Sequence, residues 1–267
     1  MRRHILAAAA AFAALCLCSC NQKHDLVIIH FNDTHSHLDP IADGDGGVIE
    51  RAAFIDSVRS AKGESNVLLL HAGDFSQGSS YFTLLHGDLE IDLLNAMKYD
   101  CVTLGNHEFD NGLEELGMRL SNLNCPVVCA NYDFSPFEAG KYITPYTIIK
   151  KAGHNIGIVG VLCDISTVVD RNTADRIPVL GSYTETANKW ASYLRNEAKC
   201  DVVIVLSHAG YREDCSAVPE LHDVDMVIGG HSHTKLDEPT MIADADGREI
   251  PVVQDWCWGH MAGVIEL

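Results

Sequence analysis

Residues 99–112, YDCVTLGNHEFDNG, change character halfway along their length. Residues 101–104 form a short apolar run, typical of a strand that is covered on both faces of a sheet. An amide, an imidazole and two carboxylates then follow within a few positions; they are Asn106, His107, Glu108 and Asp110. A tight turn rarely needs so many polar groups. We therefore expect the end of this strand to carry chemistry.

Apolar runs alternate with amphipathic ones along the rest of the chain. Continuous apolar runs predict strands at residues 25–31, 66–73, 201–207 and 224–230. Helical periodicity predicts helices at residues 47–61, 88–99, 112–123 and 183–198. In the helix at 47–61, the buried face is predicted to carry Ile49, Ala53, Phe54 and Val58. This alternation predicts an α/β fold, organised as one domain over residues 25–267.

Five of the predicted strands end in polar residues of a few recurring kinds. In open α/β sheets, ligands bind at the carboxyl ends of the strands, so neighbouring parallel strands would bring these residues together. The converging set is Asp33, His35, Asp74, Asn106, His208, His231 and His233. A single DTH or HSH tripeptide is a weak signal. The repetition at strand after strand is what favours a functional site.

The donor atoms of this set are carboxylate oxygens, one amide oxygen and imidazole nitrogens. Seven such donors are too many for one tetrahedral metal ion. They suit two divalent ions that share one carboxylate and lie about 3.5–4 Å apart, as in two-metal hydrolases. The absence of thiolate ligands fits Mn, Zn, Fe, Co, Ni or Mg, and the donor set does not choose among them.

The charge of the chain restricts its partners. Nineteen basic and 37 acidic residues give a formal net charge of −18. Such a chain repels nucleic-acid backbones and anionic membrane surfaces, so no nucleic-acid partner is expected. An anionic substrate needs a local positive centre, and two metal ions would supply one.

The first twenty residues read as an export signal and not as part of the fold. A basic start precedes an apolar run at residues 5–17, which is too short to span a bilayer. The run closes on Leu17-Cys18-Ser19-Cys20, which resembles a lipoprotein lipobox with Cys20 as the lipidated residue. An ordinary cleaved signal is the alternative. The lipobox predicts a lipid-anchored protein of the cell envelope, on the periplasmic or outer-membrane side, held to the membrane by its lipid alone.

Seven cysteines remain after the signal. Cys101, Cys129 and Cys163 lie in apolar runs, where a buried thiol is the simplest interpretation. We expect mostly free thiols, with one bridge left open.

The assembled motifs resemble those of the calcineurin-like metallophosphoesterases, and in particular the catalytic domain of the bacterial 5′-nucleotidase/UDP-sugar hydrolase branch. The matching segments, in order, are FNDTHSHL, HAGDFSQGS, YDCVTLGNHEFDNG, LSHAG and IGGHSHT. Together they cover nearly the whole chain after the signal. The resemblance implies a four-layer α/β/β/α sandwich with the metal site where the strands of both sheets end.

The resemblance also implies a role for each site residue. One ion would be held by Asp33, His35, Asp74 and His233, and the other by Asp74, Asn106, His208 and His231. His107 and Asp110 match the catalytic pair of the family. Full-length members carry a second, C-terminal domain that binds the nucleoside, and the chain stops where that domain would begin. A separate polypeptide carrying the missing part is therefore a possible partner.

Several functions stay open at this stage. The expected substrate is a small phosphoester, most simply a 5′-nucleotide. UDP-sugars, 2′,3′-cyclic nucleotides and thiosulfate esters are alternatives within the same fold. Two HxH motifs also occur in barrel amidohydrolases, but Asp33 before the first motif and GNHEFD in mid-chain do not fit that class. A non-catalytic, lipid-anchored subunit is the alternative outside enzymes.

Overall fold

The computed structural model describes residues 23–40 and 46–267, and two six-stranded sheets form its centre. The first sheet has, in spatial order, β12 (Gly263–Glu266), β1 (Val27–Phe31), β2 (Val67–His71), β3 (Cys101–Thr103), β4 (Val127–Val128) and β5 (Ile143–Thr144). The strands from β1 to β5 are parallel, and β12 is antiparallel to β1.

The second sheet also has a parallel centre, but an antiparallel strand lies at each of its edges. Its spatial order is β10 (Thr240–Ala243), β11 (Glu249–Val253), β9 (Met226–Ile228), β8 (Val202–His208), β7 (His154–Leu162) and β6 (Tyr146–Lys151). The four central strands are parallel, while β10 and β6 are antiparallel to their neighbours.

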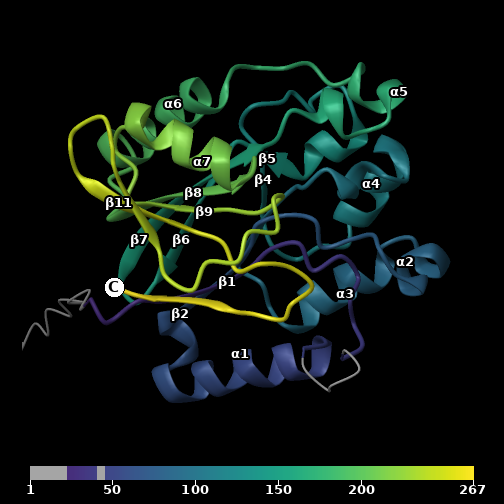
Figure 1. Ribbon diagram of the computed structural model, residues 1–267, viewed down its shortest axis with the longest axis horizontal. Helices are drawn as coiled ribbons and strands as arrows, with labels where there is room; N and C mark the ends of the chain where they lie inside the picture. The colour runs from purple at the N-terminus through teal and green to yellow at the C-terminus, as the bar shows by residue number, and fades with distance from the viewer. Residues whose placement is uncertain (1–22, 41–45) are drawn as a thin grey trace, which may run out of the picture.

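Helices cover the outer face of each sheet. The first sheet is covered by α1 (Val48–Lys62), α3 (Asp88–Ala96) and α4 (Gly112–Leu120), and the second by α6 (Tyr183–Asn196) and α7 (Tyr211–Ala217). Figure 1 shows α1 and α6 on opposite sides of the strands. The remaining short helices are α2 (Ser80–Leu85), α5 (Arg171–Ala174) and the 3₁₀ turns Glu64–Asn66, His107–Phe109, Glu138–Lys141, Ile165–Thr167 and Val218–Glu220.

Three apolar layers hold the sheets and helices together, which confirms the predicted α/β/β/α sandwich. The packing of strand β1 explains why its sequence is apolar except at His30. Its side chains alternate, so Val27 and Ile29 pack under the helices while Ile28 faces the second sheet. The layer between the sheets also contains Leu68 and Leu70 of β2. Strands covered on both faces need continuous apolar sequence, which is why the runs were recognisable.

The buried face predicted for α1 is only partly correct, because Val58 packs against the core but Ile49, Ala53 and Phe54 are exposed. Ile49 is 79% exposed and Phe54 is 36% exposed, whereas the helix buries Arg51 and Ile55. The guanidinium carbon of Arg51 lies 5.9 Å from the centre of the Phe31 ring, beneath the sheet. A long basic side chain can bury its stem and stack its head on an aromatic ring, so the helix turns a face toward the core that hydrophobicity alone does not select.

Several short elements were not predicted from the sequence, among them α2, α5, β5 and β10. The predicted lipobox, including Cys20, lies outside the described residues. Within the described ranges, no helix is long and apolar enough to cross a membrane. The seven cysteines from Cys101 onward are all free, so the bridge left open by the sequence is not formed among them.

Candidate metal centre

The predicted ligands follow strands that are neighbours in the two sheets. Asp33 and His35 follow β1, Asp74 follows β2, and Asn106 follows β3, all in the first sheet. His208 is the last residue of β8 in the second sheet, and its neighbour β9 leads into His231 and His233. The carboxyl ends of both sheets therefore meet at one place, as the polar strand ends predict.

Two groups of acidic and imidazole side chains form where the sheets meet. In the first, Nε2 of His233 lies 3.3 Å from Oδ1 of Asp33 and 2.9 Å from Nε2 of His35. In the second, Nε2 of His208 lies 3.0 Å from Oδ2 of Asp74.

The ligand atoms of Asp33, His35 and His233 lie within 4.8 Å of one another, as do those of Asp74, His208 and His231. Nε2 of His35 lies 3.8 Å from Oδ2 of Asp74, and this contact connects the two groups. A third set of ligand atoms within the same limit joins His35 and Asp74 to His107.

The backbone of the candidate ligands is strained. Asp33, His35, Asp74, His231 and His233 all have φ between 47° and 74°. Residues other than glycine rarely adopt this left-handed region, and each such residue costs of the order of 1–3 kcal/mol. None of these turns uses glycine or asparagine at the strained position. Strain that is retained at five candidate ligands indicates that the orientation of their side chains has a function.

Close approach between the loops depends on glycine at position 105. A Cβ atom on Gly105 would collide with the carboxylate and backbone nitrogen of Asp74. The β2 and β3 loops can therefore touch only if this residue has no side chain. This explains the glycine that opens the GNHEFD segment.

The two central carboxylates are buried among imidazoles. Asp33 and Asp74 are at most 2% exposed, and their side-chain ion-pair partners in the described part of the chain are all histidines. Burial alone lowers the pKa of His208, but the charges of Asp74 and Asp33 outweigh it and raise that pKa to about 10. Without a metal ion, a proton on His208 thus balances part of the buried negative charge.

These residues fit divalent cations. The Oδ1 atom of Asn106 is buried without a hydrogen-bond partner, and a buried carbonyl oxygen left in this way is costly. Nδ1 of His208 donates to the carbonyl oxygen of Ala72 at 2.6 Å, which leaves Nε2 free to ligate. Two buried carboxylates without a lysine or arginine partner need compensating positive charge. Metal ions at this position would account for all three observations.

His107 and Asp110 form the pair that the sequence predicts. Nδ1 of His107 lies 2.9 Å from Oδ2 of Asp110, and both side chains are about one-third exposed. Burial lowers the pKa of His107, but the hydrogen bond to Asp110 and the charge of Asp74 outweigh it, so the pKa is raised. The backbone N–H of His107 also donates to Oδ1 of Asp74 at 2.8 Å. The imidazole is thereby held beside the candidate metal ligands.

Glu108 lies at the centre of a hydrogen-bond network that was not predicted from the sequence. The buried Glu108 carboxylate accepts backbone N–H groups from Asp74 at 2.9 Å, Ser76 at 3.1 Å and Gly105 at 2.6 Å. It therefore ties the β2 loop to the β3 loop. The only indication in the sequence was its position between His107 and Asp110.

Two further residues contact the site in ways that the sequence did not reveal. Asn32 donates from Nδ2 to Oδ2 of Asp33 at 2.5 Å and to the carbonyl oxygen of Trp256 at 2.6 Å. The ring of His37 stacks on Trp258, with 4.6 Å between the ring centres.

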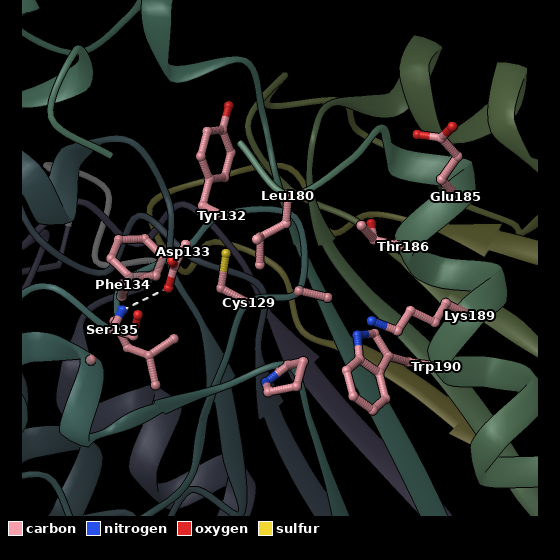
Figure 2. A pocket seen from close by; sticks show the side chains of 14 residues that line it. Cys129, Tyr132, Asp133, Phe134, Ser135, Leu180, Glu185, Thr186, Lys189 and Trp190 are labelled. Atoms are coloured by element: carbon pink, nitrogen blue, oxygen red, sulfur yellow. Dashed lines mark hydrogen bonds between the residues drawn. The ribbon is translucent and has the colours of Figure 1, made fainter. Parts of the chain in front are cut away.

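A cavity of about 560 Å³ lies away from the strand ends, and none of the candidate metal ligands lines it. Figure 2 shows Lys189 and Trp190 on one side of this cavity, facing Cys129 and Ser135 on the other. Among the residues that the structure describes, the clusters of metal-ligating side chains lie at the strand ends and not in this cavity.

A sandwich of two sheets with clustered carboxylates and imidazoles at its strand ends is the architecture of a metal-dependent phosphoesterase. The sequence profile of the calcineurin-like phosphoesterases matches residues 26–235. The chain therefore belongs to the calcineurin-like phosphoesterase family.

Within this family the chain is similar to 5′-nucleotidases. It is 32% identical to snake venom 5′-nucleotidase of Naja atra, over 91% of this chain and 50% of the relative. A solved 5′-nucleotidase precursor from Thermus thermophilus has a TM-score of 0.82 at 31% identity, over 91% of this chain and 51% of the other.

The NAD nucleotidase of Haemophilus influenzae has a TM-score of 0.79 at 29% identity, over 92% of this chain and 47% of the other. The chain thus spans about half the length of the relatives it matches.

Proposed function

We propose that the chain hydrolyses a phosphoester of a nucleotide, most simply a 5′-nucleoside monophosphate, at a centre of two divalent metal ions. The observation that carries the proposal is the pair of acid–imidazole groups around buried Asp33 and Asp74. The similarity to 5′-nucleotidases supports the substrate class. Mn, Zn, Fe, Co, Ni and Mg all suit these donors.

The ligand assignment proposed for the two ions follows the two groups. Asp33, His35, Asp74 and His233 would hold one ion. Asp74, Asn106, His208 and His231 would hold the other, with Asp74 shared. Ions bound in this way supply a water molecule of lowered pKa and neutralise charge on the phosphoryl oxygens.

The function that we propose for His107 is that of a cationic hydrogen-bond donor to the substrate. Its Nδ1 is engaged by Asp110, so Nε2 is available to a phosphoryl oxygen or to the leaving oxygen. Because its pKa is raised, the imidazolium form persists to higher pH than that of a free histidine. A donor already held in place stabilises the charge that develops in the transition state and protonates the departing group.

The substrate panel that tests this function contains AMP, UDP-glucose, 2′,3′-cyclic AMP and bis-p-nitrophenyl phosphate. Residues 21–267 would be stripped with chelator and assayed with added Mn, Zn, Co or Mg. We expect AMP to be the best substrate and His107→Ala to lower kcat by about 10²- to 10⁴-fold. A preference for one of the other esters would select the matching alternative, and thiosulfate esters would be assayed in the same way.

Bound metal without turnover on any ester would instead support a non-catalytic subunit, or one that needs a separate polypeptide to complete the substrate site. The 5′-nucleotidase relatives are about twice as long as this chain, which is the reason to include that partner. Adding a candidate partner to the metal-loaded chain and measuring AMP hydrolysis would separate these two cases.

We also propose that the protein is exported and anchored in the cell envelope by a lipid on Cys20. The support is the sequence of residues 1–20 alone. Replacing Cys20 by alanine should move the protein from the membrane fraction to the soluble fraction of the envelope. Equal membrane association of both forms would contradict the lipid anchor.

A further inference from the structure

Four aromatic rings lie in a row beside the metal centre. The ring of His37 is 4.6 Å from that of Trp258, which is 6.0 Å from His260, which in turn is 5.3 Å from Trp256. We call these four residues the aromatic platform. His37 is two positions from His35, so the row begins at the loop that carries the first group of candidate ligands.

The platform is tied directly to Asp33. The backbone N–H of Trp258 donates to the carbonyl oxygen of Asp33 at 2.7 Å. The Nδ2 atom of Asn32 donates hydrogen bonds to both Oδ2 of Asp33 and the carbonyl oxygen of Trp256. The position of the two tryptophans is therefore coupled to that of a candidate metal ligand.

The two tryptophans keep an unusual conformation and an unusual exposure. Trp256 has φ 70° and Trp258 has φ 60°, a region that bulky side chains seldom adopt. Trp256 is 37% exposed and Trp258 is 38% exposed. Strained residues concentrate at ligand sites, and large aromatic rings left partly open to solvent mark binding surfaces.

The charge around the platform suits a phosphoester. The Nζ atom of Lys235 lies 5.9 Å from the centre of the Trp256 ring. In a chain with a formal charge of −18, the ammonium group of Lys235, which also lies 3.7 Å from Oδ1 of Asp237, places a positive charge beside the rings.

We propose that the aromatic platform stacks the planar base of the substrate while its phosphoester lies at the metal centre. This proposal rests on the proposed function and names the part of the substrate that the chain itself recognises. Every base has a π face, and stacking on an aromatic side chain contributes about 5- to 150-fold in affinity per base. The platform therefore selects nucleotides over sugar phosphates of the same charge.

The kinetic test compares AMP with ribose 5-phosphate, which lacks the base. We expect the ratio of kcat/KM for AMP to that for ribose 5-phosphate to fall by about 5- to 150-fold in Trp258→Leu. The conservative change Trp258→Phe keeps a ring and should retain most of the ratio. Trp190→Phe is the matched control, because Trp190 lines the remote cavity (Figure 2) and should leave the ratio unchanged.

A binding test keeps the proposal separate from catalysis. In a Trp190→Phe background, the only tryptophans left are Trp256 and Trp258. Adenosine should quench their fluorescence and ribose should not, in the chelator-treated chain as well as in the metal-loaded one. The quenching should weaken at least 5-fold when Trp258 is also replaced by leucine.

The outcomes are distinguishable. Quenching by adenosine without turnover of any ester would support the platform and contradict the proposed function. Turnover of AMP with an equal loss for both substrates in Trp258→Leu would overturn the platform and keep the function. Adenosine and ribose giving the same fluorescence response would also overturn it, and the exposed rings would then be a docking surface for another polypeptide.

Discussion

His35 and His233 are 198 positions apart in the sequence, yet their Nε2 atoms lie 2.9 Å apart beside Asp33. Two imidazole nitrogens at this distance share one proton or turn their lone pairs toward one cation. The contact brings the loop after β1 together with the loop after β9, which follow the first and the last of the predicted strands with polar ends. It also explains why both histidines keep a strained backbone.

Removal of His233 should empty one of the two proposed ion sites. We expect about two divalent ions per chain in the reconstituted protein and about one in His233→Ala, measured by elemental analysis after dialysis. His222→Ala is the control, since His222 is exposed and pairs with Asp246 away from the centre. Two ions retained in His233→Ala would show that this histidine is not a ligand.

Asp110→Asn should shift the pH dependence of hydrolysis. The hydrogen bond to Asp110 counters burial and raises the pKa of His107, so its loss lowers that pKa. The imidazolium form then disappears at lower pH, and the alkaline limb of the kcat profile should move toward acid. An unchanged limb, with kcat reduced equally at every pH, would mean that Asp110 does not act through the protonation of His107.

Glu108→Gln should loosen the loops that carry the centre. The amide cannot accept all three backbone N–H groups that the carboxylate accepts, and we expect a loss of about 2–4 kcal/mol in the free energy of unfolding. Metal affinity should fall by about 10- to 100-fold, as for other residues that hold ligands in place.

Urea unfolding and metal titration measure the two effects of Glu108→Gln. Glu114→Gln, an exposed carboxylate paired with Arg176, provides the matched control. Wild-type stability and metal affinity in Glu108→Gln would contradict the role of Glu108 as a tie between the loops.

The candidate metal ligands were predictable because ligand sites at the carboxyl ends of strands are a regular feature of α/β sheets. Asp33, Asp74 and His208 each follow an apolar run, so their positions depend on local sequence and on parallel pairing alone. The role of Glu108 depends on where three backbone N–H groups lie after folding, and the spacing of residues in the sequence does not predict those positions. The exposure of Ile49 on α1 likewise depends on the burial of Arg51. Helical hydrophobic periodicity places a charged residue such as Arg51 on the exposed face, so it does not predict this burial.

Asp214 should make the stability of the protein depend on pH. Burial raises the pKa of this carboxyl to about 7, although Ser207 and Tyr183 donate hydrogen bonds that lower it. The folded state favours the protonated form, so this group destabilises the fold progressively as pH rises from about 4 to about 7.

Asp214→Asn removes that titration. Relative to the wild type, the free energy of unfolding of this variant should rise by at most about 4 kcal/mol between pH 4 and pH 8. Chemical denaturation at several pH values in chelator measures the difference, and Asp237→Asn on the surface should follow the wild type. Parallel curves for Asp214→Asn and the wild type would show that Asp214 titrates normally.

The central claim is that the buried carboxylates and imidazoles at the strand ends hold the metal ions of a phosphoesterase. The most direct measurement is phosphate release from AMP by the chelator-stripped chain as Mn is added back, for the wild type, Asp74→Ala and the control Asp56→Ala on the exposed side of α1. We predict no release without metal, activation that saturates at about two ions per chain, and loss of activity only in Asp74→Ala. Release that is independent of metal, or that persists in Asp74→Ala, would contradict the claim.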